Sequence, residues 1–194
     1  MVIGGGSPGH DWVTHLTLPR VISLLPDGLL GQEPPVELQG LRRLHWSETN
    51  LNLEGNHLLG IKSSTFEIIA EIEIGGATSV GMDIRASDDF TLKTRLVYDV
   101  VNSKLNLDGF NADFKLLPGE DVLRLHAFVD RSVVEAFTNR REVGTVRAFQ
   151  DINNQAIRLF SEGGTARIRS VDVWEMGSIW ERPKKTSSPP NGSY

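Results

Sequence analysis

The chain of 194 residues contains no cysteine. This absence excludes disulfide bonds, thiolate nucleophiles and zinc sites built on cysteine. It does not decide between an oxidising and a reducing compartment, so localisation stays open, and a longer parent enzyme could be secreted or cytoplasmic. The opening residues, MVIGGGSPGHDW, lack a basic segment followed by an apolar run, so we expect no secretory signal in this sequence.

Long apolar runs and an excess of positive charge are also missing. No stretch approaches the roughly 20 apolar residues that cross a membrane as a helix. The net charge is -5 and the pI is about 5.5, which argues against nucleic acid and against an anionic membrane surface as partners. Hydrophobic residues make up 39% and charged residues 23%, a balance typical of a soluble globular chain that buries a core.

Sustained helical periodicity is absent as well, whereas apolar and polar residues alternate along much of the chain. The segment from Phe66 to Ile74 alternates in this way and predicts a strand. The most informative stretch runs from Leu123 to Phe149 and predicts a hairpin followed by a third strand. Its turns are expected at Asp130-Arg131-Ser132 and at Asn139-Arg140-Arg141, where short polar residues favour a reversal.

Many short strands separated by turns predict an all-β fold. We expect an antiparallel β-sandwich, jelly-roll or concanavalin-like, with roughly ten or more strands. Residues 1–28 are expected to be a lead-in and the remnant of a join to a preceding domain, and residues 29–40 a connector containing Pro34-Pro35. The sandwich itself should occupy residues 41–182, and the polar, proline-rich residues 183–194 should form a flexible tail.

Patterns for metals, cofactors and catalysis are scarce. The histidines do not fall at local metal-ligand spacings, so we predict no metal and no cofactor. The histidines are His10, His15, His45, His57 and His126. No Gly-x-Ser-x-Gly elbow occurs, and the glycine clusters do not open helices as phosphate-binding loops do.

Carboxylates could in principle supply the two acids of a glycosidase. The residues to consider are Asp88, Asp89, Asp130, Glu135 and Glu162. Most of them lie in loop-like segments or at predicted turns, where acidic residues are common for structural reasons. We therefore predict no catalytic residue and no self-contained active site in this chain.

Sugar contact is the binding chemistry that remains. Trp46 is flanked by polar residues, so its ring is the one most expected to be exposed for stacking on a sugar. Asp130, Arg131 and Glu135 could hydrogen-bond sugar hydroxyls in directed pairs. These four residues are the candidate carbohydrate-binding set, although a tryptophan in a sandwich is more often a core residue and a polar turn more often structural.

Several motifs in order resemble the end of glycoside hydrolase family 32, the family of invertases, levanases, inulinases and other β-fructofuranosidases. The segments are WVTHLTLPRVISLLPDGLL, PPVELQGLR, LRLHAFVDRSVVEAFTNRREVGTVRAF and LFSEGGTARIRSVDVWEM, within about residues 11–180. The resemblance implies a C-terminal β-sandwich preceded by the closing strand of a catalytic β-propeller. The family's catalytic motifs, Asn-Asp-Pro-Asn-Gly, Arg-Asp-Pro and Glu-Cys, do not occur in this sequence.

The resemblance therefore implies a non-catalytic accessory module of a fructan- or sucrose-hydrolysing enzyme, with the propeller as its partner. Two alternatives stay open. One is a stand-alone carbohydrate-binding module for β-fructosides such as levan and inulin. The other is a structural or dimerisation module, because a surface once covered by a propeller tends to find another partner, including a second copy of the chain.

Overall fold

The computed structural model describes residues 2–3, 14–149 and 151–180, so the predicted tail at 183–194 and most of the glycine-rich lead-in lie outside the described residues. The strands are β1 (Val2–Ile3), β2 (His15–Leu16), β3 (Val21–Leu24), β4 (Leu30–Glu33), β5 (Arg42–Leu53), β6 (Asn56–Leu58), β7 (Thr65–Glu73), β8 (Ser79–Ala86), β9 (Thr94–Asp99), β10 (Lys104–Leu107), β11 (Phe110–Asp113), β12 (Val122–Asp130), β13 (Val133–Thr138), β14 (Glu142–Arg147), β15 (Ala156–Glu162) and β16 (Ala166–Met176). A 3-10 helix, η1 (Val36–Leu41), precedes β5.

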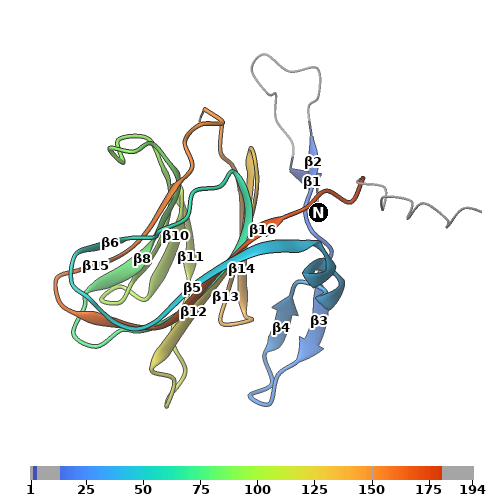
Figure 1. Ribbon diagram of the computed structural model, residues 1–194. Coiled ribbons are helices and arrows are strands. Elements are labelled where there is room, and N and C mark those ends of the chain that lie inside the picture. Colours follow the sequence, from blue (N-terminus) through green and yellow to red (C-terminus); the bar gives the residue numbers. More distant parts are fainter. Residues whose placement is uncertain (1, 4–13, 150, 181–194) are drawn as a thin grey trace, which may run out of the picture.

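Two six-stranded antiparallel sheets form the body of the molecule (Figure 1). The first sheet has the order β14-β13-β12-β7-β16-β5, and the second has the order β11-β10-β9-β8-β15-β6. The predicted antiparallel sandwich is confirmed. In the first sheet β12 pairs along its whole length with β7, from Val122 opposite Glu73 to Asp130 opposite Thr65.

The turns follow the residues that favour them. Asn139 and Arg140 both have positive φ, and the Arg141 N–H donates to the Thr138 carbonyl at 2.9 Å. Two central residues with positive φ define the type I′ turn that matches the twist of a tight hairpin. This turn joins β13 to β14 and confirms the reversal predicted there.

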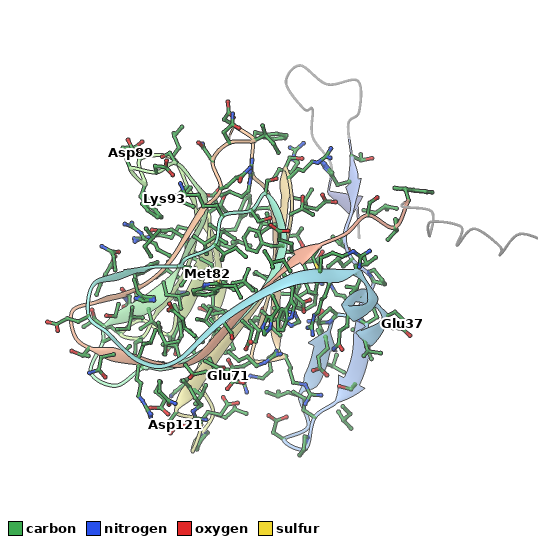
Figure 2. All side chains as sticks on the ribbon, in the orientation of Figure 1. Glu37, Glu71, Met82, Asp89, Lys93 and Asp121 are labelled. Atoms are coloured by element: carbon green, nitrogen blue, oxygen red, sulfur yellow. The ribbon has the colours of Figure 1, made fainter. Side chains whose placement is uncertain are left out.

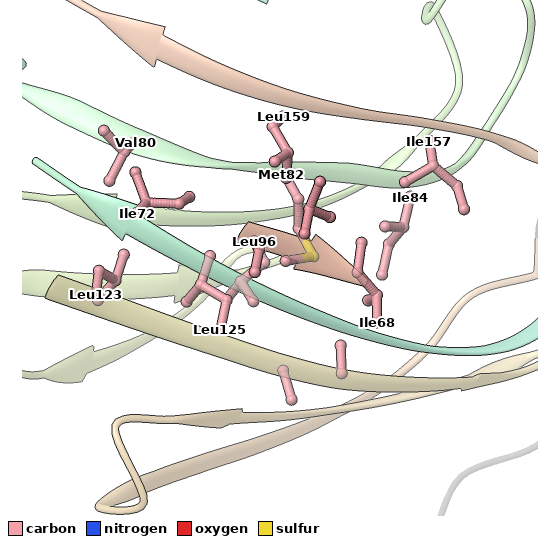
Figure 3. Close-up of a cluster of buried hydrophobic side chains, with 14 of the residues drawn as sticks. Ile68, Ile72, Val80, Met82, Ile84, Leu96, Leu123, Leu125, Ile157 and Leu159 are labelled. Carbon is pink, nitrogen blue, oxygen red and sulfur yellow. The ribbon is translucent and has the colours of Figure 1, made fainter. Parts of the chain in front are cut away.

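Alternation along the central strands places one apolar face of each sheet against the other. Figure 3 shows Ile68 and Ile72 of β7 with Leu123 and Leu125 of β12, side by side with residues of the second sheet. Met82 of β8 lies in the middle of the molecule (Figure 2) and is fully buried. Since each fully buried aliphatic side chain contributes about 1.5–3 kcal/mol, this layer is the main source of stability.

The segment before the sandwich lies against the outer face of the first sheet, on the side away from the second sheet (Figure 1). It contains the two-stranded hairpin β3–β4 and then η1. Pro26 and Asp27 form the hairpin turn, and Gly28 adopts φ +83 at its end. A two-stranded hairpin is only marginally stable alone, so contacts with a neighbouring surface must hold it in place.

Candidate functional site

The β3–β4 hairpin is attached to the first sheet by polar contacts. The guanidinium of Arg20 donates to the Glu135 carboxylate from Nε at 3.1 Å and from Nη2 at 3.0 Å, and the Leu18 N–H donates to its other oxygen at 2.9 Å. The Gln32 N–H donates to the Arg140 carbonyl at 2.6 Å. The hairpin thus meets the β13–β14 hairpin through backbone as well as side-chain contacts.

Glu135 is 2% exposed, and a buried carboxylate without a partner would be costly. Arg20, which is about one-fifth exposed, supplies the compensating charge from the segment that precedes the sandwich. The ion pair therefore fixes where that segment crosses the sheet.

The same segment carries a concentration of exposed apolar side chains. These residues are Leu16, Val21, Ile22, Leu24, Leu29, Leu30 and Val36, with exposed fractions from 45% to 79%. Contiguous exposed apolar surface on a folded domain usually marks an interaction site. Ile22, Leu24 and Leu30 lie on one face of the hairpin by register and alternation, and we call these three residues the hairpin patch.

A second ion cluster lies on the outer face of the first sheet, beside η1. Arg42 donates to both oxygens of the Glu67 carboxylate at 2.7 Å, and Nε2 of His126 lies 2.7 Å from Glu67 Oε1. Glu67 is 1% exposed. Arg42 also lies over the ring of Trp174, 3.8 Å from its centroid, and a hollow of about 450 Å³ opens beside the cluster.

The pKa values in this cluster follow from burial and hydrogen bonding. Burial opposes ionisation of Glu67, but the hydrogen bonds from Arg42 and His126 outweigh it and lower its pKa to about 2. Burial lowers the pKa of His126 and exceeds the opposing effect of its hydrogen bond to Glu67. Glu67 is therefore a carboxylate at neutral pH, and the cluster positions Arg42 at the start of β5.

The structure separates the sequence-predicted sugar-binding residues. Asp130 and Arg131 are adjacent and exposed at the β12–β13 turn, where the Arg131 N–H donates to the Ser64 carbonyl. Glu135 is buried beneath Arg20. Trp46 lies on β5, and β16, β7 and β12 separate this edge strand from β13.

The expectation that the Trp46 ring is exposed is wrong. The ring is partly buried and packs against the core. Gly60 lies close beside it, since a β-carbon added to this glycine would be 3.1 Å from Trp46 Nε1. Its polar neighbours in sequence point to the opposite face of β5, as alternation along a strand requires. The four residues thus do not form one continuous site.

Sequence reasoning missed Arg20, Arg42 and Glu67 as a group. Glu67 was visible as a polar residue in the alternating segment from Phe66 to Ile74, where polar alternation usually means a solvated face. Burial of that face depends on the segment before the sandwich folding back across it. No spacing in the sequence records this long-range contact.

Other kinds of site are not found in the part of the chain that the structure describes. No group of three or more histidine or acidic side chains there could hold a metal ion. No helix within residues 2–3, 14–149 and 151–180 is long and apolar enough to cross a membrane.

Curated relatives match most of this chain but only part of their own length. A levanase of Bacillus sp. (strain L7) is 30% identical over 200 residues, covering 89% of this chain and 21% of the levanase. A levanase of Bacillus subtilis (strain 168) is 27% identical over 196 residues, covering 89% of this chain and 29% of the levanase. The chain therefore spans less than a third of the length of either levanase.

Solved structures show the same fold. An exo-inulinase from Aspergillus awamori superposes with a TM-score of 0.77 and 23% identity, covering 90% of this chain and 38% of the inulinase chain. Fructan 1-exohydrolase IIa from Cichorium intybus superposes with a TM-score of 0.73 and 18% identity, covering 86% and 42%. Because both sequence identities are below 25%, these two structures show that the fold is shared and nothing further.

The family model described as "Glycosyl hydrolases family 32 C terminal" matches residues 37–175, which include η1 except Val36 and the strands from β5 to β16 except Met176. The match extends over well more than half of the sequence and agrees with the sandwich fold and with the levanase relatives. This chain belongs to the C-terminal domain family of the family 32 glycosyl hydrolases.

Proposed function

We propose that this chain is a non-catalytic accessory domain that supports a catalytic β-propeller of a fructan- or sucrose-hydrolysing enzyme. The observation that carries the proposal is the hairpin patch, which is apolar, exposed and fixed to the sandwich through Arg20 and Glu135. The family's catalytic motifs are absent from the sequence, so hydrolysis is assigned to the partner.

The physical basis is the open hairpin. β3 and β4 form a sheet of two strands, and the outer edge of β4 already meets the sandwich where the Gln32 N–H donates to the Arg140 carbonyl. The outer edge of β3 has no strand partner among the described residues. Such edges and exposed apolar side chains favour addition to another sheet. The Arg20–Glu135 pair then links that partner to the sandwich and fixes the orientation of the join.

A mixing experiment tests the proposal. A levanase propeller domain produced without its own C-terminal domain is combined with this chain, and thermal stability and levan hydrolysis are measured. We expect this chain to raise both, and the variant Ile22→Asp/Leu24→Asp to lose the effect because charge on the patch opposes its burial.

The matched control is Leu92→Asp/Val101→Asp, which also adds two negative charges at exposed apolar residues, 58% and 71% exposed, in loops of the second sheet. This variant should behave like the unchanged chain. Release of sugar from levan, inulin or sucrose by this chain alone would contradict the accessory role. Equal effects of the patch variant and the control on thermal stability and levan hydrolysis would also contradict it.

Binding of β-fructosides is the second candidate function, and the polar groups exposed on the sandwich favour it. Asp130 and Arg131 are adjacent, exposed charged residues at the β12–β13 turn, and Trp46 and Glu135, the other two residues predicted from the sequence, lie apart from them. Calorimetric titration with levan and inulin oligosaccharides tests this function. No heat at millimolar sugar would exclude it.

Self-association through the hairpin patch is a further consequence of the same surface when no propeller covers it. Analytical ultracentrifugation should show an oligomer of the unchanged chain and a monomer of the Ile22→Asp/Leu24→Asp variant. A strictly monomeric chain at high concentration would contradict a dimerisation role while leaving the propeller contact open to the mixing experiment.

A further inference from the structure

The outer face of the second sheet carries polar side chains arranged in rows across the strands. The pairing registers place Glu162, Ser79, Asp99 and Lys104 in one row across β15, β8, β9 and β10. The neighbouring row on the same face runs through Phe160, Gly81, Val97, Asn106 and Asn111 across β15 to β11. With strands about 4.8 Å apart, five strands span about 19 Å.

The surface of the sheet is sunken along the second row because the residues at its centre have small side chains. Gly81 has no side chain, and a β-carbon there would lie 2.1 Å from the Leu96 carbonyl oxygen and 2.8 Å from the Phe160 ring. Phe160 is buried beneath the guanidinium of Arg95, 4.0 Å from the ring centroid. Val97 and its polar neighbours thus border a hollow of about 580 Å³, which we call the trough.

The polar groups around the trough are held in place by one another. Arg95 pairs with Glu162 at 3.2 Å and with the fully buried Asp83 at 2.9 Å. The Asn106 amide donates to Asn111 Oδ1 at 2.9 Å, and the Asn102 amide donates to Asp99 at 2.7 Å. A carboxamide nitrogen carries two hydrogens, so each of these bonds orients the amide and leaves a second donor available.

The charges bordering the trough balance. The lining carries two positive charges, Arg95 and Lys104, and two negative charges, Asp99 and Glu162. Lys104 is also paired with Asp113 on β11, so the net charge of the lining favours neither an anion nor a cation. The hydrogen bonds from Asn102 lower the pKa of Asp99, which keeps this carboxylate an acceptor at neutral pH. A balanced mixture of fixed donors and acceptors suits a neutral ligand with many hydroxyl groups, because each hydroxyl both donates and accepts.

The trough also lies on the opposite face of the sandwich from the β3–β4 hairpin (Figure 1). A propeller on the hairpin would therefore leave the trough open to a ligand. Its volume is within the range of about 300–1,000 Å³ that is usual for small-molecule sites.

We propose that the trough on the outer face of β8 to β11 binds a neutral oligosaccharide, with short β-fructosides as its ligand. This inference deepens the second candidate function, because the choice of a fructoside rests on the proposed link to fructan hydrolysis. It places the binding site away from Asp130, Arg131, Glu135 and Trp46.

Titration of the full chain with levan- and inulin-derived oligosaccharides tests the site. Val97→Phe fills the floor with a residue that strands accept well, and Asn111→Ala removes an amide without removing a turn contact. Both variants should weaken binding, the double variant by about tenfold or more, since lost hydrogen bonds add to lost volume. Asn52→Ala, an exposed amide on β5 of the first sheet, is the matched control and should bind normally.

The outcomes separate the site from the function. Normal binding by both trough variants, or loss of binding only in Asp130→Ala/Arg131→Ala, would overturn the trough and retain sugar binding elsewhere. No heat and no chemical-shift change at millimolar sugar would overturn both. Inorganic phosphate that competes with the sugar at the trough would overturn the neutral-ligand assignment. The propeller-mixing experiment measures the accessory role independently of all these results.

Discussion

Replacing Arg42 by methionine tests the reasoning about buried charge on the first sheet. The substitution preserves much of the side-chain volume but removes both hydrogen bonds to Glu67. It leaves a carboxylate that is 1% exposed with His126 as its remaining hydrogen-bond partner in the cluster. The structure thus predicts an uncompensated buried charge on the central strand β7.

The expected loss of stability is large. Removing one partner of a buried ion pair typically costs about 3–5 kcal/mol. The contact of Arg42 with the Trp174 ring contributes about 0.5–1 kcal/mol more. Because the Arg42 side chain is about one-fifth exposed and some water can reach the vacated space, we expect a value near the lower end, about 3 kcal/mol.

Urea unfolding followed by tryptophan fluorescence measures this change. With a slope of about 2 kcal/mol per molar urea, a loss of about 3 kcal/mol lowers the midpoint by about 1.5 M. Arg43→Met is the matched control, because Arg43 is exposed and its side chain donates to the carbonyls of Gly40 and Arg42. Surface substitutions of this kind change stability by about 0.5 kcal/mol or less.

A double variant separates charge from packing. Arg42→Met/Glu67→Gln removes the unpaired charge and should recover about 1–2 kcal/mol relative to Arg42→Met alone. Equal effects of Arg42→Met and Arg43→Met would refute the claim that Glu67 depends on Arg42. A double variant no more stable than the single one would show that lost packing, not charge, sets the cost.

The Glu67–His126 contact makes stability depend on pH, and Gly81 makes it depend on close packing. In the folded chain the pKa of His126 lies below 6.5 and that of Glu67 at about 2 rather than 4.5, so both groups bind protons more readily when unfolded. The stability that these two groups contribute is therefore complete above pH 6.5 and is lost as the pH falls, first through protonation of His126 and then through protonation of Glu67 toward pH 2. When the urea midpoint is measured against pH, His126→Gln should make the curve flatter at its upper end. An unchanged slope would contradict a role for His126 in this pH dependence. Gly81→Ala should lower the free energy of unfolding by about 1–3 kcal/mol because its β-carbon collides with the Leu96 carbonyl. Gly76→Ala is the control, since a β-carbon there meets nothing within 4 Å, and urea unfolding should show almost no change in its stability.

Sequence alternation predicted the sandwich because its signal is local. The strand predicted from Phe66 to Ile74 is β7, and the hairpin and third strand predicted from Leu123 to Phe149 are β12, β13 and β14. Each of these inferences needs only the period of two along a strand and the chemistry of the neighbouring turn.

The candidate site was not predictable in the same way, because it depends on which strands become neighbours. Glu135 looked like a polar group available to a ligand until Arg20, 115 residues away, was found to neutralise it. Trp46 has polar neighbours in sequence but core neighbours in space. The trough joins residues of β8, β9, β10, β11 and β15, and only the registers of four strand pairs bring them into rows.

The order of strands has a consequence for how the chain folds. β16, the last strand, lies between β7 and β5, and β15 lies between β8 and β6. The long strand β5, the first strand of the sandwich, pairs with no described strand of its sheet except β16. A growing chain therefore cannot satisfy the backbone of β5 until residues 166–176 have been synthesised. Pairings of such long sequence separation make folding slow and expose unpaired edges meanwhile. The sandwich should therefore complete in a late step that the C-terminal strands control, and loss of β16 should leave an aggregating chain rather than a smaller domain.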